Sequence, residues 1–197
     1  MKTCILSKAV ELFMRLGFKS VTMNDVASNL GASKKTLYQY FINKEDLVRQ
    51  TVEFVHDTIR NDIDKIREQG YNAIEENFKI NTLFKEFLKN SENSPQYQLK
   101  KYYPNIYSRL MEKELAIFQN CLTDNFKKGI QEGLYRTGVN IDVFSRFYFA
   151  LIHGLHDPEM FDYSNLSKLE FEALEYHTRA IATTKGLHIL DTELSKL

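Results

Sequence analysis

Apolar positions recur along almost the whole chain with the spacing of an α-helix. Ile5, Ala9, Leu12 and Leu16 form one stripe, and Gly17 directly after them predicts the end of a first helix. Alternating β-branched positions never persist, and no Asn-Gly or Asp-Gly pair marks a hairpin. The pattern therefore predicts an all-α protein.

Helix-start residues and apolar stripes place the remaining elements. Thr22 and Asp25 have the spacing of a capping box, and Ser33 and Asn43 are further cap residues. Helices are expected at about 22–30, 33–41, 43–69, 72–89, 104–133, 140–156 and 165–184, with a short one at about 96–103. The separators between the later helices are the polar stretch 90–97, residues 133–138 and the pair at 157–158. Residues 186–197 are expected to form a tail that packs back or frays.

Two short helices separated by the sequence GAS at 31–33 are the pattern of a helix-turn-helix, which needs a turn glycine, a small residue and a cap. The stretch 33–47, SKKTLYQYFINKEDL, contains three lysines and two tyrosines. Only Leu37, Phe41 and Leu47 in it are spaced like core residues. We therefore expect a helix that displays most of its polar side chains.

Composition limits the class of protein. Apolar residues make up 43% and charged residues 26%, as in ordinary soluble domains. Cys4 and Cys121 lie far apart without a CxxC pair, which argues against a disulfide framework and favours the reducing cytoplasm. No signal-peptide pattern opens the chain, and no apolar stretch approaches the roughly 20 residues that span a bilayer. We expect a cytoplasmic protein.

The neutral net charge conceals an asymmetry. Residues 1–50 hold eight Lys or Arg against four acidic residues, whereas the whole chain holds 26 of each. The head is therefore basic and the rest of the chain is acidic. This distribution indicates that the head meets a polyanion.

One spaced set of residues covers the head. It consists of Ala9, Leu12-Phe13, Gly17-Phe18, Thr22, Val26-Ala27, Leu30-Gly31-Ala32-Ser33, Thr36-Leu37-Tyr38, Tyr40-Phe41 and Lys44-Glu45-Leu47. With this set, residues 5–47 resemble the DNA-binding domain of the TetR family of bacterial transcriptional regulators. The resemblance implies a three-helix helix-turn-helix domain at 1–46, joined by a long helix to a helical effector-binding and dimerisation domain at 47–197.

The chemistry of the third helix suggests which residues read DNA. Lys35, Thr36 and Gln39 are candidates for base contacts, because Gln pairs with adenine and Lys reaches guanine in the major groove. Lys34 is expected nearer the phosphates. The alternative for both lysines is a solvated surface face. Lys35 stands where the family commonly has a small residue, so a lysine there changes which bases can be approached.

The resemblance adds phosphate contacts that position the head without reading sequence. It assigns them to Thr22, Tyr38, Tyr40 and Lys44. Thr22 is also a helix cap, and one of the two tyrosines has packing against the long helix as its alternative role.

For the body, the resemblance implies an effector pocket and a homodimer built from the last two long helices. Pocket candidates are Phe54, Phe84, Phe87, Tyr103, Tyr107, Phe118, Phe147 and Tyr148. Dimer-interface candidates are Phe149, Ile152, His156, Leu166, Leu174, His177 and Ile181. Ordinary core packing is the alternative for each aromatic residue.

No pattern in the sequence points to catalysis or to a bound metal. GxSxG, HExxH, GxGxxG and P-loop sequences are missing. His153, His156 and Asp157 invite a metal interpretation, but no third convincing ligand is nearby, and a helix-end histidine pair is favoured. We expect no cofactor and no metal.

The resulting interpretation is a DNA-binding regulator, most simply a repressor released from a palindromic operator by a small, largely apolar effector. The alternative is a DNA-dependent interaction protein whose helical body binds a protein partner.

Overall fold

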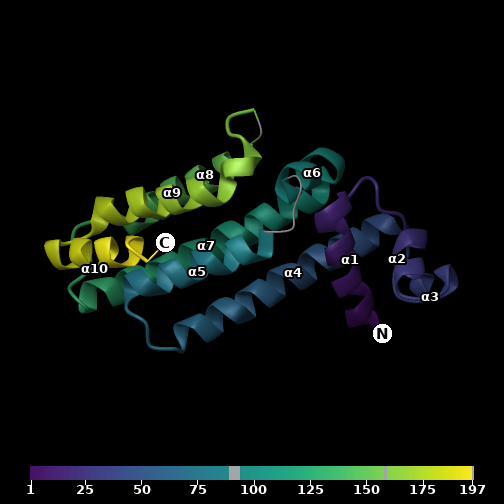
Figure 1. Ribbon diagram of the computed structural model, residues 1–197, viewed down its shortest axis with the longest axis horizontal. Helices are drawn as coiled ribbons and strands as arrows, with labels where there is room; N and C mark the ends of the chain where they lie inside the picture. The colour runs from purple at the N-terminus through teal and green to yellow at the C-terminus, as the bar shows by residue number, and fades with distance from the viewer. Residues whose placement is uncertain (89–93, 158, 197) are drawn as a thin grey trace. The chain divides into compact units, whose positions relative to one another are not determined.

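The computed structural model describes residues 1–88, 94–157 and 159–196. The helices are α1 (Lys2–Leu16), α2 (Met23–Asn29), α3 (Lys34–Tyr38), α4 (Lys44–Arg67), α5 (Ala73–Leu88), α6 (Pro95–Tyr102), α7 (Pro104–Gln131), α8 (Ile141–Leu155), the 3-10 helix η1 (Tyr163–Asn165), α9 (Leu166–Ile181) and α10 (Thr184–Leu194) (Figure 1). Within these described residues the β-structure is limited to one isolated bridge between Tyr135 and Ala182. The predicted all-α class is confirmed. Parts of the predicted separators at 90–97 and 157–158 lie outside the described residues.

The helices group into two compact units. Unit 1 comprises Met1–Asp62 with Leu88–Arg109, and unit 2 comprises Ile63–Phe87 with Leu110–Leu197. The long helices α4 and α7 each contribute residues to both units. The compact units therefore do not follow the single boundary expected at residue 46, because the segment around α6 packs with the head.

The core of unit 1 is formed by the apolar stripes of its short helices. Ile5, Leu12, Leu37 and Leu47 come from α1, α3 and α4, and each is at most 1% exposed. Burying such a side chain contributes about 1.5–3 kcal/mol. This core holds the polar face of α3 in a defined orientation.

Helix α6 attaches to the turn after α1. The backbone N–H of Phe18 donates a hydrogen bond to Gln98 Oε1 at 3.0 Å. Gly17 has φ 81°, and a Cβ there would collide with the Gln98 amide, so the position favours glycine on both counts. The Phe18 ring also lies 5.0 Å from that of Phe13 and 6.3 Å from that of Tyr103.

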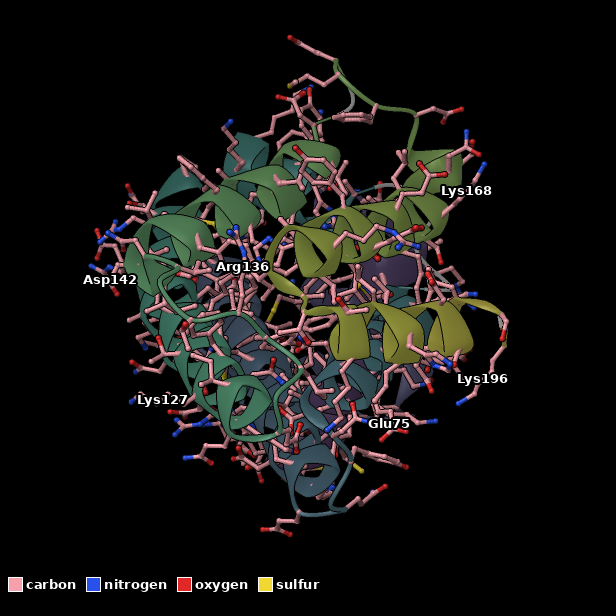
Figure 2. The ribbon with its side chains drawn as sticks, turned by 90° about the vertical axis from the view of Figure 1, so that its left-hand side faces the viewer. Glu75, Lys127, Arg136, Asp142, Lys168 and Lys196 are labelled. Carbon is pink, nitrogen blue, oxygen red and sulfur yellow. The ribbon has the colours of Figure 1, made fainter. Side chains whose placement is uncertain are left out.

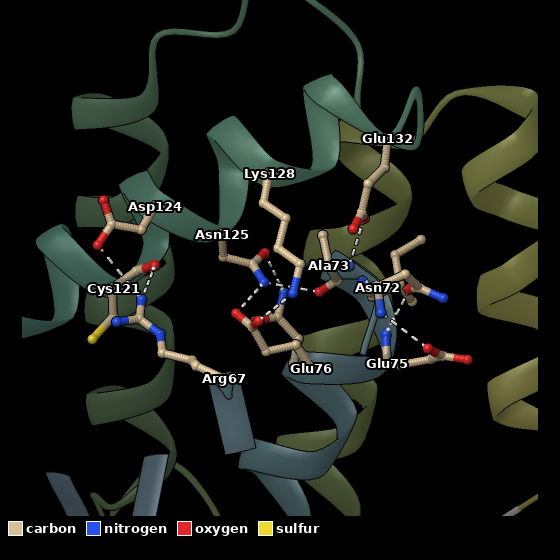
Figure 3. A network of polar contacts seen from close by, with 12 residues as sticks. Arg67, Asn72, Ala73, Glu75, Glu76, Cys121, Asp124, Asn125, Lys128 and Glu132 are labelled. Carbon is tan, nitrogen blue, oxygen red and sulfur yellow. Dashed lines mark hydrogen bonds and ion pairs between the residues drawn. The ribbon is translucent and has the colours of Figure 1, made fainter. Parts of the chain in front are cut away.

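A buried polar network joins α5 and α7 in unit 2 (Figure 3). Asn125 Nδ2 donates to the Ala73 carbonyl and to Glu76 Oε1, both at 2.9 Å. Asn125 Oδ1 accepts from Asn77 Nδ2 at 3.0 Å and from the Tyr135 hydroxyl at 3.2 Å. Both the donor and the acceptor capacity of this amide are used, as burial requires.

Glu76 is held by the same network from a second side. Its side chain is 4% exposed, and its Oε2 accepts from Lys128 Nζ at 2.7 Å. The backbone N–H of Ala73, at the start of α5, donates to Glu132 Oε2 at 2.8 Å (Figure 3). Two carboxylates thus fix the first turn of α5 against α7.

Of the two alternatives expected for residues 186–197, the segment packs back rather than frays, and most of its described part forms the helix α10 (Thr184–Leu194). Thr183 caps this helix, because its Oγ1 accepts from the Gly186 N–H at 3.1 Å. Leu190 is fully buried, and the Thr183 N–H donates to the Leu134 carbonyl at 2.9 Å. Gly186 lies so close to the Leu134 carbonyl that any Cβ would overlap it. The cap and the apolar spacing therefore produced a packed helix rather than a frayed end.

Charged side chains of unit 2, such as Lys127, Asp142 and Lys168, point away from their helices (Figure 2). In the described part of the chain, no helix is both long enough and apolar enough to cross a membrane.

Candidate DNA-binding site

The turn between α2 and α3 has the geometry that the GAS sequence predicts. Gly31 has φ 63°, a conformation that glycine adopts without strain. The N–H groups of Leu30 and Ala32 both donate to the Ala27 carbonyl, at 3.1 and 3.0 Å. These bonds close α2 and reverse the chain directly into the cap of α3.

Ser33 begins α3. Its Oγ accepts from the Thr36 N–H at 3.0 Å and lies 2.8 Å from the Thr36 hydroxyl. Helix α3 ends at Tyr38, earlier than the predicted end near Phe41. The chain continues as a turn, in which the N–H groups of Tyr40 and Phe41 both donate to the Leu37 carbonyl at 3.0 Å, and Ile42 then donates its N–H to Asp46 Oδ2 at 3.0 Å.

Burial separates the two faces of this segment. Leu37 and Phe41 are at most 1% exposed, as their spacing predicted. Lys34, Lys35 and Gln39 are exposed. The two tyrosines are exposed as well, Tyr38 at 47% and Tyr40 at 38%, and Thr36 is half-buried. The structure brings all six predicted contact residues of this segment to the accessible side.

Thr22 and Lys44 flank α3 from the starts of α2 and α4. Thr22 forms the predicted capping box, with Asp25 N–H donating to Thr22 Oγ1 at 3.2 Å and Thr22 N–H donating to Asp25 Oδ2 at 2.8 Å. Lys44 Nζ donates to the Lys19 carbonyl at 2.9 Å. Burial lowers the pKa of Lys44, while the nearby negative charge of Asp25 opposes this shift.

Two exposed residues beside these contacts were not among the sequence candidates. Lys19, whose carbonyl holds Lys44, lies in the turn between α1 and α2. Ile42 is 82% exposed between α3 and α4. The position of Lys19 directly after Gly17-Phe18 could have marked it as a turn lysine in the sequence. No sequence signal indicated that Ile42 would be exposed.

Comparison with known proteins identifies the family of the head. The model of the bacterial regulatory proteins of the tetR family matches residues 5–51, which contain every residue of this site. The head of the chain is therefore a DNA-binding domain of the tetR-family type. TetR-family proteins are transcriptional regulators rather than enzymes, and they bind operator DNA and small effectors.

Similarity to transcriptional regulators extends beyond the head. The uncharacterised HTH-type transcriptional regulator YvaF of Bacillus subtilis (strain 168) is 29% identical over 160 residues, covering 79% of this chain and 80% of that protein. The biofilm operon icaADBC negative transcriptional regulator IcaR of Staphylococcus epidermidis is 31% identical over 75 residues, covering 36% of this chain and 40% of IcaR. The crystal structure of a TetR-family regulator from Agrobacterium tumefaciens has TM-score 0.72 at 16% identity, covering 92% of this chain and 97% of that one, and shows the same fold.

The predicted pocket residues are divided between the two units. Phe54, Tyr103 and Tyr107 belong to unit 1, and Phe84, Phe87, Phe118, Phe147 and Tyr148 belong to unit 2. Tyr148 is 7% exposed, and its ring lies 5.7 Å from that of Phe118. Its neighbour Phe147 is 71% exposed. Adjacent side chains on a helix point about 100° apart, so the face that buries Tyr148 leaves Phe147 facing outward.

Most predicted dimer residues are buried inside the single chain. His156, Leu166, Leu174, His177 and Ile181 are each at most 8% exposed. Phe149 and Ile152 are half-buried. The apolar side chains that α8 and α9 leave exposed are different ones, Val143 at 43%, Phe147 at 71% and Tyr176 at 74%. The sequence showed that two faces of α8 are apolar. It did not show which of these faces is buried within the single chain.

His177 is enclosed by aromatic rings. The Phe144 ring lies 3.6 Å from it and the Tyr148 ring 3.8 Å, both stacked. Burial lowers the pKa of His177 to about 3. Below pH about 6.5 the His177 imidazole takes up a proton in the unfolded chain but stays neutral in the folded one. The free energy of unfolding therefore decreases as the pH falls from about 6.5 toward 3.

We expect His177→Leu to weaken the acid sensitivity of unfolding. Between pH 6 and 4 the free energy of unfolding of the wild type should fall more steeply than that of the variant, by about 1.4 kcal/mol per pH unit. Glu114, whose pKa is raised to about 7 by burial, acts in the opposite direction but is common to both proteins. Urea titrations at several pH values measure the difference, and exposed His188→Leu is the control. Parallel pH profiles for wild type and His177→Leu would contradict the assignment.

Proposed function

We propose that the protein is a repressor that binds a palindromic operator as a homodimer and releases it when a small effector binds the helical body. The observation that carries the proposal is the accessible face of α3, flanked by Thr22 and Lys44 at the starts of α2 and α4. Helix N-termini and lysines attract phosphate, and Lys35, Thr36 and Gln39 are suited to base edges. The description of IcaR as a negative regulator supports repression.

A homodimer is supported by the apolar side chains that α8 and α9 expose. Val143 and Phe147 lie one turn apart on α8, and Tyr176 lies on α9. Covering such residues with a second copy of the chain removes apolar surface from water. Two heads would then contact half-sites separated by about 34 Å, one turn of B-DNA.

The effector acts through its different affinity for two arrangements of the dimer. Helix α4 is one continuous element that begins at Lys44, a proposed phosphate contact, and ends in unit 2. A shift of this helix would change the spacing of the two heads and thereby lower operator affinity.

The first test is footprinting of the purified protein on the intergenic DNA upstream of its own gene, at several salt concentrations. We expect a protected palindromic site and a steep salt dependence, because phosphate contacts release counterions. A protein that protects no site on its upstream DNA or on selected random sequences would refute the proposal.

Two substitutions test which residues contact phosphates and which contact bases. Lys44→Ala should weaken binding to all sequences similarly and reduce the salt slope by about one. Gln39→Ala should change base preference, with a loss of about 1–3 kcal/mol confined to one position in each half-site. Binding to an operator and its single-position variants provides the measurement.

Lys168→Ala is the matched control, because this lysine is 78% exposed on α9, outside the head. An equal loss over all operator variants for both Lys44→Ala and Gln39→Ala would contradict the assigned roles.

A further inference from the structure

Helix α6 and the turn between α1 and α2 carry a row of cations beside the candidate DNA-binding site. The row begins at Lys44, whose Nζ donates to the Lys19 carbonyl at 2.9 Å. Lys19 Nζ lies 5.5 Å from the centre of the Tyr102 ring, at the end of α6. Lys101 Nζ lies 5.7 Å from the same ring and 5.6 Å from that of Tyr97. Lys19, Lys101 and Tyr102, here named the α6 strip, therefore adjoin a proposed phosphate contact within unit 1.

Separate contacts fix α6 against the turn that carries Lys19. The Phe18 N–H donates to Gln98 Oε1 at 3.0 Å, and the Phe18 ring lies 6.3 Å from that of Tyr103. Leu99 anchors the helix from within, since it is only 3% exposed. The lysines at the end of α6 are thus held at the edge of the head rather than carried on a separate arm.

The charge of this region favours an anionic partner. Residues 94–109 contain Lys100, Lys101 and Arg109 and no acidic residue, although the chain after residue 50 is acidic as a whole. Lys19 and Lys101 are exposed, and neither forms an ion pair with an acidic side chain in the part of the chain that the structure describes. Like charges gathered at one ring repel each other, whereas a nearby phosphate attracts both.

The ring at the centre of the strip suits a phosphate surface. Aromatic faces attract cations within about 6 Å of the ring centre, so Tyr102 holds both ammonium groups in place. The residue is itself 38% exposed, and a tyrosine hydroxyl can donate to a phosphate oxygen. Each strand of DNA carries a phosphate about every 3.4 Å along the helix axis. A strand bound at Lys44 therefore presents further phosphates to cations beside it.

We propose that α6 is a second DNA-contacting element, in which Lys19 and Lys101 bind backbone phosphates that flank the base pairs read by α3. These contacts add affinity without base preference, because phosphates carry no sequence information. The inference rests on the proposed function. It extends the DNA-binding surface from the helix-turn-helix to a helix of the segment 47–197, which the sequence assigned to the effector-binding and dimerisation domain.

Operator titration at several salt concentrations tests the added contacts. The first probe is a duplex from the footprinted region, trimmed to the base pairs whose substitution changes affinity. The second extends this duplex by one further turn, about ten base pairs, on each side. On the longer duplex, Lys19→Gln and Lys101→Gln should each reduce the salt slope by about one. The ratio of wild-type to variant affinity should then fall about fourfold for each lysine as salt rises from about 50 to about 200 mM.

Matched variants separate a phosphate contact from a general loss of charge or fold. Lys101→Arg keeps the positive charge and should retain the wild-type slope, because the slope counts neutralised phosphates. Arg60→Gln is the control, since it removes an exposed cation of unit 1 about four turns after Lys44 on α4. On the trimmed duplex every variant should bind as the wild type does, which also shows that it is folded.

Unchanged slopes for both Lys19→Gln and Lys101→Gln on the longer duplex would overturn the inference. An equally large loss on the trimmed duplex, or in Arg60→Gln, would overturn it as well, since flanking phosphates are then not the cause. The two proposals fail separately. A chain that protects an operator but shows no effect of these lysines remains a regulator whose DNA contacts end at the helix-turn-helix. A chain that binds neither its own upstream DNA nor selected sequences refutes the repressor itself.

Discussion

Phe147→Asp is expected to convert the proposed dimer into a folded monomer and to lower operator affinity by about 10²–10⁴-fold. The side chain is 71% exposed in the single chain, so its replacement leaves the core of unit 2 intact. In a dimer interface the new carboxylate would be desolvated without a partner. In a dimer, binding of one head to its half-site raises the effective concentration of the second head at the other half-site. A monomer lacks this effect, which accounts for the expected loss of operator affinity by about 10²–10⁴-fold.

Sedimentation and operator titration measure these two consequences separately. Met160→Asp is the matched control, because Met160 is a similarly exposed apolar residue, at 68%, that lies outside α8 and α9. A Phe147→Asp protein that remains dimeric would place the interface elsewhere.

Asn125→Leu is expected to lower the free energy of unfolding by about 3–5 kcal/mol, because several buried partners lose their hydrogen bonds together. The change leaves the Ala73 carbonyl, Glu76 Oε1 and the Asn77 amide to find new partners inside unit 2. For a chain of this size the midpoint of thermal unfolding should fall by roughly 10 °C. Thermal and urea unfolding followed by circular dichroism provide the measurement.

Asn120→Leu is the control for this substitution, since Asn120 is exposed on the same helix, α7. Its expected effect is within about 0.5 kcal/mol of zero. Equal free energies of unfolding for Asn125→Leu and Asn120→Leu would show that the hydrogen bonds of Asn125 do not stabilise the fold.

The candidate DNA-binding residues could be chosen from the sequence because the signals are local. A cap at Ser33, a glycine at position 31 and the spacing of Leu37 and Phe41 define which side of α3 is buried. The remaining side chains must then be displayed. The roles of single residues in DNA contact stay predictions, since they depend on the DNA surface as well as on the chain.

The body offered no such local signals. Phe147 and Tyr148 are adjacent in the sequence and both aromatic, yet one is 71% and the other 7% exposed. The periodicity of α8 permits either face to be buried, because both are apolar. Packing of Tyr148 against Phe118 and His177, from two other helices, decides between them.

The sequence by itself determined the all-α class, the positions of most helices other than α10, and the resemblance of the head to the TetR family, because caps, turn glycines and apolar periodicity act within a few residues. Tertiary structure decided which polar groups are buried together. Glu76 and Lys128 meet across 52 positions, and His156 meets Glu170 from another helix. Such pairs depend on how helices pack, and the free energy of burying a charge is set by neighbours that no local pattern specifies.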